Sequence, residues 1–347
     1  MKSFLKNIMV SISIGIEILK SFLIMCLVLA AIVTALSAVI HNVFKIREIY
    51  AEDKLGYKKL VTVSNNRMNV QVVGEGERTA IILSSFGTPS PIIQYKACAD
   101  TLAANGYRVV IIEYFGYGYS LSTKDSRTLA AIASEVNEAL TNSNIYGPYT
   151  LIACGISGLY AETYANNYPD QVERLILIDS VYAASIDEAY MRKYIDELSF
   201  NITLTSWAEM TGYARIMSYV KPDMFGIDKM QELGYSNNDI SVYRKMIANR
   251  FYTATMKREF RMLSTNMEML KNYVFPEYLP VTQIFSSEYS NEFAQYKAEN
   301  LMKKDLDDYA EGLITNSQIQ KIVSIDGEKE NLNLSNPGEV VSIILEN

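Results

Sequence analysis

The sequence predicts an α/β protein in which helices flank a mostly parallel eight-stranded sheet, with an inserted helical cap and one transmembrane helix in front. Three observations predict this fold class. From residue 60 onward, eight short runs rich in β-branched residues are separated mostly by helix-like stretches. About a hundred residues between the sixth and seventh runs look helical throughout. One uncharged stretch of twenty residues lies close to the N-terminus.

The uncharged stretch, Ser21–Ile40 (SFLIMCLVLAAIVTALSAVI), is long enough to cross a bilayer. At about 1.5 Å per residue, such a helix spans about 30 Å. A buried core helix would carry a polar face at a helical period, and this stretch has no charged residue. A cleaved signal peptide is the remaining alternative, favoured by the small residues Ala35–Ala38, but the leader in front is long for one. We expect an uncleaved single-pass anchor.

The boundaries of this N-terminal part follow from the same pattern. We expect a leader over residues 1–20, the transmembrane helix over 21–41 and a linker over 42–59. Three basic residues precede the span and three follow it closely, so the charge rule for orientation is a tie. Because a short leader precedes a long domain, we expect that domain to be extracytoplasmic.

Charge and composition exclude several classes of function. Residues 1–50 carry a net charge of +3 and residues 51–347 a net charge of -10, which excludes the cationic surface of a nucleic-acid binder. The chain has one histidine, His41, and its three cysteines (Cys26, Cys98 and Cys154) form no metal-binding pattern. We therefore expect neither a metal site nor a cofactor, and we expect buried, unpaired cysteines.

The candidate strands divide the rest of the chain. They are LVTVSN (60–65), MNVQVV (68–73), TAIIL (79–83), RVVIIE (108–113), YTLIA (149–153), ERLILI (173–178), VTQIF (281–285) and KIVSI (321–325). The first two flank Asn66-Arg67 and predict a hairpin. We expect a core over 60–180 and 277–347, interrupted by a helical cap over 181–276. The cap holds ten of the fifteen methionines, which either fill its interior or form a pliable surface over a ligand.

Three ordered motifs resemble the α/β-hydrolase family. The segment YTLIACGISGLYAETYANNYPDQVERLILIDS (149–180) is similar to the family's central strand, nucleophile elbow and following helix. Upstream, GEGERTAIILSSFGTPSPI (74–92) resembles the third strand and oxyanion loop, and EYFGYGYS (113–120) resembles the D-x-x-G-x-G-x-S turn. The resemblance covers residues 60–347 and implies the α/β-hydrolase fold, with the cap between the sixth and seventh strands.

The resemblance also implies a serine nucleophile at the elbow, and that serine is absent. The register set by Gly158-Leu159-Tyr160 places Gly155 at the nucleophile position and Cys154 at the histidine before it. Ala153 and Ser157 keep the small residues that let strand and helix approach, so we expect the turn to persist. Glycine adopts the strained backbone angles of this turn at little cost.

The base is absent as well. The C-terminal segment 324–347 resembles the family's last strand, histidine loop and final helix, and in that register Glu330 occupies the base position and Asn333 that of a second histidine. The acid position falls near Glu288, with Asp179 as the alternative. A degenerate triad of Gly155, Glu288 and Glu330 follows, with no residue assigned confidently to catalysis.

Backbone groups that bind an oxyanion can persist without the triad. They would be the N–H of Ile156 and one N–H near Ser85 or Phe86. We expect Phe86, Gly155, Ile156 and Ser157 to form a ligand pocket, with Ser157 in a structural role. Candidate partners are the membrane, through the N-terminal helix, and either a small carbonyl or carboxylate ligand or another protein.

Three functions remain open from the sequence. The first is a catalytically inactive protein that binds a ligand or partner. The second is an atypical ester or amide hydrolase with a rebuilt site, and the third is a structural subunit of a membrane complex. The fold alone does not separate them.

Overall fold

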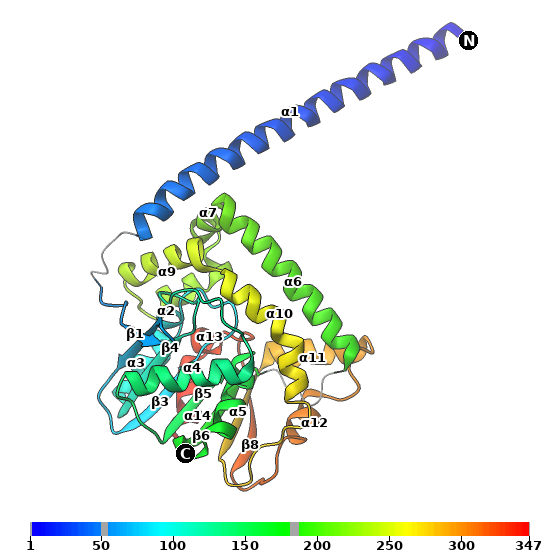
Figure 1. Ribbon diagram of the computed structural model, residues 1–347. Helices are drawn as coiled ribbons and strands as arrows, with labels where there is room; N and C mark the ends of the chain where they lie inside the picture. The colour runs from blue at the N-terminus through cyan, green and yellow to red at the C-terminus, as the bar shows by residue number, and fades with distance from the viewer. Residues whose placement is uncertain (1, 50–54, 181–186, 347) are drawn as a thin grey trace.

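An eight-stranded sheet forms the centre of the molecule. The computed structural model describes residues 2–49, 55–180 and 187–346 (Figure 1). The strand order is β1-β2-β4-β3-β5-β6-β7-β8; β2 is antiparallel to both neighbours and the other pairs are parallel. The strands are β1 (Leu60–Val63), β2 (Asn66–Val73), β3 (Arg78–Leu83), β4 (Tyr107–Glu113), β5 (Tyr149–Cys154), β6 (Val172–Ile178), β7 (Val281–Ser286) and β8 (Gln320–Ile325). The predicted fold class is confirmed. The predicted β1–β2 hairpin is present, but its turn is Ser64-Asn65, and Asn66 and Arg67 are paired within the hairpin as the first residues of β2.

Helices of the core cover both faces of the sheet. They are α2 (Pro91–Gln94), α3 (Lys96–Ala104), α4 (Leu129–Asn142), α5 (Ser157–Asn167), α11 (Ser287–Ala298), α12 (Leu306–Glu311), α13 (Leu332–Ser335), α14 (Pro337–Leu345) and the single 3-10 turn η1 (Pro169–Gln171). The side chains of each strand alternate between two apolar clusters. In β3, Ile81 and Leu83 belong to the cluster that contains α4 and α5, and Ala80 and Ile82 to the cluster that contains α3 and α14.

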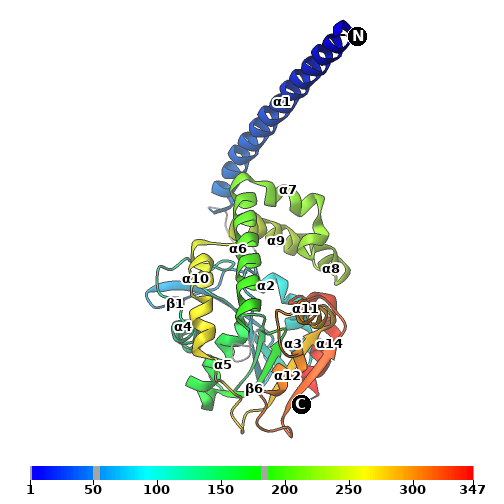
Figure 2. The ribbon, with the colours of Figure 1, turned by 90° about the vertical axis from the view of Figure 1, so that its right-hand side faces the viewer.

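The cap is a set of helices inserted between β6 and β7. It consists of α6 (Glu188–Thr211), α7 (Tyr213–Val220), η3 (Pro222–Phe225), α8 (Ile227–Glu232), α9 (Asn237–Arg250) and α10 (Ala254–Met269). Residues 181–186, where we expect the cap to begin, lie outside the described residues. Figures 1 and 2 show the cap helices between the sheet and the N-terminal helix.

The N-terminal helix α1 (Lys2–Ile49) is longer than the predicted span of 21–41. It continues through the predicted leader and into the predicted linker, and residues 2–20 and 42–49 contain no proline that would end a helix. It is the one helix in the described part of the chain that is long and apolar enough to cross a membrane, and its apolar segment is unburied. Length and composition fit either an anchor or a signal sequence.

The C-terminal end of α1 packs against the cap. Both terminal nitrogens of Arg215 donate to the Glu48 carboxylate at 2.8 Å, and Asn249 Nδ2 donates to the same group at 2.7 Å. One turn of α1 inside the apolar stretch also takes part, because the hydroxyls of Thr34 and Tyr213 lie 3.2 Å apart. Polar contacts therefore hold α1 on α6, α7 and α9 at a defined place.

The Arg215–Glu48 pair should stabilise this packing measurably. Both side chains are largely buried, at 18% and 17% exposed, so Arg215→Gln leaves a carboxylate short of donors. We expect a loss of about 1–3 kcal/mol, seen as a lower melting temperature of the full-length protein in detergent. The control is Arg192→Gln, which removes an exposed arginine from α6. Equal melting of the two variants would contradict the assigned contact.

Candidate functional site

The turn between β5 and α5 is built around Gly155. The residue has φ +54°, the left-handed region that glycine enters without a Cβ penalty. Its N–H donates to the carbonyl of Ile178 at 2.9 Å, which ties the turn to the end of β6. A Cβ at Gly158 would lie 2.6 Å from Ser180 Oγ, so α5 approaches the sheet as closely as a glycine permits. The strand, turn and helix predicted from residues 149–180 are therefore present.

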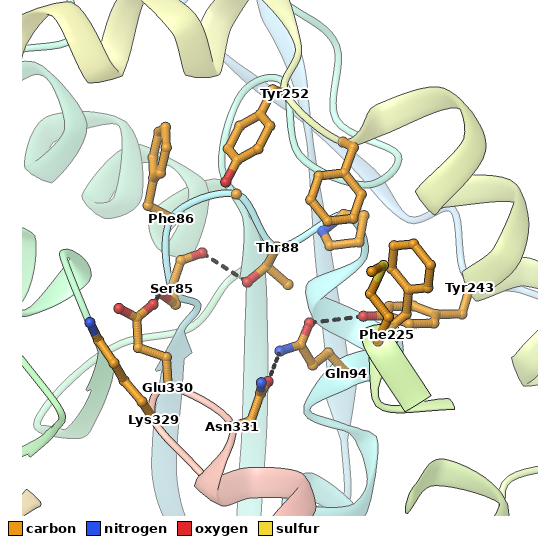
Figure 3. A pocket seen from close by; sticks show the side chains of 14 residues that line it. Ser85, Phe86, Thr88, Gln94, Phe225, Tyr243, Tyr252, Lys329, Glu330 and Asn331 are labelled. Atoms are coloured by element: carbon orange, nitrogen blue, oxygen red, sulfur yellow. Dashed lines mark hydrogen bonds between the residues drawn. The ribbon is translucent and has the colours of Figure 1, made fainter. Parts of the chain in front are cut away.

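Two side chains fill the space in front of Gly155. A Cβ built on this residue would lie 2.6 Å from Ser85 Oγ and 2.8 Å from both Cδ and Oε2 of Glu330. The Ser85 hydroxyl donates to Glu330 Oε2 (Figure 3). Glu330 comes from the loop between β8 and α13 and also has a left-handed φ, +56°. The structure thus brings the predicted base position into contact with the predicted nucleophile position.

Asp179, the alternative acid, binds the backbone of the loop that carries Glu330. It follows β6, is fully buried, and accepts hydrogen bonds from the backbone N–H of Ser286 at 2.7 Å and of Glu330 at 2.8 Å. Burial raises the pKa of Asp179 to about 6, although both backbone hydrogen bonds favour the ionised form. Its carboxylate therefore joins the ends of β6 and β7 to the loop.

Glu288, the other acid candidate, also acts on this loop. It lies exposed on α11 and accepts a hydrogen bond from the backbone N–H of Lys329 at 2.7 Å. The two acid candidates thus bind consecutive backbone groups of the loop. Both contacts are made to the backbone of the loop and not to the Glu330 side chain, so the two carboxylates hold the loop in place.

The remaining predicted site residues lie in the interior of the protein, beside the elbow. Ser157 is buried; its hydroxyl donates to the carbonyl of Ser84 at 2.5 Å and lies 3.1 Å from the Tyr114 hydroxyl. Ile156 borders a narrow recess shared with Phe86. Cys154 is buried, and burial raises the pKa of its thiol. These contacts give Ser157 the structural role expected from its position on the helix.

Four further residues discussed from the sequence lie elsewhere. Cys98 is buried and unpaired, like Cys154, but the expected burial is wrong for Cys26, which is exposed on α1. Asn333 donates through its side chain to the carbonyl of Gln94 at 2.7 Å and so ties α13 to α2. His41 lies on α1 against the cap, far along the chain from Gly155. Within residues 2–49, 55–180 and 187–346, no group of three or more metal-binding side chains converges.

Of the two candidates for the oxyanion donor in the loop after β3, Ser85 and Phe86, one is already engaged. The N–H of Ser85 donates to the Tyr95 hydroxyl at 3.2 Å. Phe86 is therefore the remaining candidate in that loop. Gly155, Ile156 and Ser157 lie below the Ser85–Glu330 contact and do not line the open cavity, whereas Phe86 does.

The cavity lies above this contact and holds about 280 Å³. Core loops supply one side and the cap supplies the other (Figure 3). Its lining residues are Ser85, Phe86, Gly87, Thr88, Pro89, Gln94, Lys329, Glu330 and Asn331 from the core, and Met224, Phe225, Tyr243, Phe251 and Tyr252 from the cap. The cap residues carry no spacing pattern in the sequence that would have singled them out.

Glu330 is the acidic group of this cavity. Burial raises the pKa of its carboxyl, although the charge of Lys329 and the hydrogen bond from Ser85 both lower this pKa. Lys329 is itself engaged, because its Nζ lies 2.6 Å from Glu292 and 5.4 Å from the centre of the Tyr289 ring. The cavity therefore presents a carboxyl group among aromatic rings.

The arrangement of strands, elbow and inserted cap is that of a known fold. A model of the α/β hydrolase fold matches residues 81–226. The chain has the α/β-hydrolase fold. Over 287 residues it is 24% identical to the uncharacterized protein YbdG of Bacillus subtilis (strain 168), covering 81% of this chain and 84% of that protein.

Solved structures with the α/β-hydrolase fold agree with this assignment. Epoxide hydrolase VrEH1 from Vigna radiata superimposes with a TM-score of 0.62 at 15% identity, over 83% of this chain and 96% of that one. Potato (Solanum tuberosum) epoxide hydrolase I superimposes with a TM-score of 0.61 at 17% identity, over 83% of this chain and 97% of that one. At these identities the likeness concerns the fold.

The buried carboxyl of Asp179 should give stability a distinct pH dependence. The pKa of Asp179 in the folded state is about 6, above the ordinary value of 3.8, because burial favours the neutral carboxyl. The folded state therefore holds this proton more tightly than the unfolded state does. The resulting contribution to the free energy of unfolding is full below about pH 4 and is lost as the pH rises through about 6. Asp179→Asn does not titrate. We expect the stability of the wild type relative to this variant to fall by about 3 kcal/mol between about pH 4 and pH 7.

Chemical unfolding of both proteins in detergent across this pH range measures the difference. Asp170→Asn, which changes an exposed aspartate, is the control and should show no such trend. A difference between wild type and Asp179→Asn that stays constant with pH would contradict the burial of an ionisable Asp179.

Proposed function

We propose that this protein is a membrane-anchored, non-catalytic member of the α/β-hydrolase fold that binds a small amine or alcohol in the cavity at Glu330. One observation carries the proposal: Glu330 and Ser85 meet in front of Gly155, where the fold's chemistry would need a nucleophile. With glycine there and no histidine in the domain, serine-hydrolase chemistry lacks both its nucleophile and its base.

The chemistry of the cavity favours a ligand that donates a hydrogen bond. The Glu330 carboxylate accepts hydrogen bonds and attracts a cation, and it would repel a carboxylate ligand. Phe86, Phe225 and Tyr252 line the same space, and aromatic faces add to the binding of an ammonium group. This reasoning replaces the carbonyl or carboxylate ligand expected from the sequence.

The contacts of α1 support retention of the anchor. Thr34 and Ser37 lie before or within the small-residue run where a signal peptide would be cleaved, yet both are packed near α7, at Tyr213 and Gly212. Cleavage there would remove these contacts. A helix that is docked on the folded domain and continues outward for many turns suits an anchor (Figure 2).

The proposed ligand class can be tested by thermal shift. Propylamine and propanol should raise the melting temperature of the full-length protein, with the amine stronger, and propionate should not. Glu330→Gln should abolish the amine effect because the ligand then loses its charged partner. Glu328→Gln is the matched control, since this glutamate lies in the same loop and pairs with Lys229 instead. Stabilisation by propionate, or by propylamine in Glu330→Gln, would refute the ligand class.

A second candidate is a hydrolase with a rebuilt site, favoured by the hydrogen bond from Ser85 to Glu330. A carboxyl with a raised pKa beside a serine hydroxyl is a candidate base. Incubation with a fluorophosphonate separates the two functions. The non-catalytic protein remains unlabelled, whereas stoichiometric labelling at Ser85 would establish the hydrolase.

The geometry around Gly155 predicts when activity can be restored. Gly155→Ser alone should remain inactive, because no histidine is present to take the proton of the new hydroxyl. The substitution should also lower the free energy of unfolding by about 1 kcal/mol or more, since φ is +54° and the new Cβ crowds Glu330. Gly155→Ser combined with Glu330→His supplies both groups in contact. We expect esterase activity in the double variant only, measured with an activated short-chain ester.

Glu330→His alone is the control for this pair. Activity in either single variant would show that another residue acts as nucleophile or base. A folded double variant that is neither active nor labelled would contradict the assignment of position 330 to the base.

A further inference from the structure

A second, larger cavity lies between α1 and the cap. It holds about 730 Å³ and is separate from the elbow, although Tyr252 borders both cavities. Its walls come from the end of α1, the C-terminal half of α6, the end of α9 and the start of α10. No motif in the sequence pointed to it, because its residues are far apart in the chain.

The cavity is positively charged in an acidic protein. Lys45, Arg250 and Lys257 line it, against one carboxylate, Glu209, which lies 3.2 Å from Lys45. Among the described residues, neither Arg250 nor Lys257 has an acidic group within salt-bridge distance. Two cations therefore face this space without a salt bridge, although Glu113 and Glu209 attract Arg250 at longer range, while the whole chain carries -7.

Backbone and amide groups add to the site. Thr253 caps the N-terminus of α10 and Ala254 begins this sixteen-residue helix, and both line the cavity. The positive end of the helix dipole is thus directed at the same space as Arg250 and Lys257. The side-chain oxygen of Asn249 is buried without a donor, so it can accept a hydrogen bond from a hydroxyl of the ligand.

An exposed apolar face leads away from this charged cavity. Phe200, Leu204, Trp207 and Met210 follow each other at helical spacing along α6 and are 67%, 53%, 47% and 65% exposed. Trp207 and Met210 also line the cavity. Trp207 stacks on Tyr213, whose hydroxyl contacts Thr34 within the apolar stretch of α1. Trp and Tyr side chains beside an apolar helix are typical of a membrane interface.

We propose that the cavity between α1 and the cap binds the phosphate group of an anionic amphiphile, with a phospholipid of the surrounding bilayer as its source. Arg250, Lys257 and the N-terminus of α10 would hold the phosphate. The acyl chains would lie along α1 and the exposed face of α6. The proposal rests on the proposed membrane anchorage but not on the Glu330 cavity, so failure of amine binding leaves it standing.

The test uses the full-length protein, delipidated in an uncharged detergent. Melting temperatures are recorded with dioctanoyl-phosphatidylglycerol, dioctanoyl-phosphatidylcholine, glycerol 3-phosphate and inorganic phosphate. We expect phosphatidylglycerol to raise the melting temperature most. Arg250→Gln/Lys257→Gln should bind it about tenfold or more weakly, because each cation supplies a charge-assisted hydrogen bond.

A matched pair of substitutions controls for the change in net charge. Arg192→Gln/Lys271→Gln removes one arginine and one lysine outside the cavity and should bind phosphatidylglycerol like the wild type. If the cavity variant proves unstable, Lys257→Gln alone, with native mass spectrometry of retained lipid, gives the same comparison.

The ligands separate the outcomes. Equal shifts with glycerol 3-phosphate would support the phosphate site and overturn the lipid source. Equal shifts with phosphatidylcholine, equal losses in the cavity and control variants, or no shift with any of the four compounds would overturn the site itself.

Discussion

The candidate site depends on the hydrogen bonds that Asp179 accepts. This buried carboxylate binds the N–H of Ser286 at the end of β7 and the N–H of Glu330 in the loop after β8. Three segments that are distant in the chain therefore meet at one point on the carboxyl edge of the sheet, where ligands bind in open α/β folds. Together with Glu288, which binds the neighbouring N–H of Lys329, this anchor holds Glu330, with its left-handed φ, against Gly155.

Glycine at the elbow determines which side chains can meet there. Gly155 leaves room for the Glu330 carboxyl and the Ser85 hydroxyl to meet where a serine side chain would otherwise project. The contact covers the elbow, so the open cavity begins above it and is lined by Phe86 and the aromatic residues of the cap. At the elbow, the wall of the cavity therefore carries a carboxyl group.

The parts of the site that follow local motifs could be predicted from the sequence. The strand, turn and helix over 149–180 are contiguous, so Gly155 was placed at the elbow from its neighbours, and Glu330 followed from the last strand and final helix. The choice between Glu288 and Asp179 remained open because both follow adjacent parallel strands that end at the same edge. The cavity wall from the cap could not be predicted, since Phe225, Tyr243 and Tyr252 are positioned by helix packing and belong to no motif. The full length of α1 was not predicted, because the charged residues that flank the apolar stretch mark the edges of a possible membrane span and not the ends of the helix.

A crystal structure of the full-length protein with propylamine bound tests the central claim most directly. The account predicts that the Glu330 carboxyl contacts both Ser85 Oγ and the ligand ammonium, directly above Gly155, while its N–H still donates to Asp179. A Glu330 side chain directed away from Gly155, with the amine bound elsewhere or the elbow open to the cavity, would contradict it.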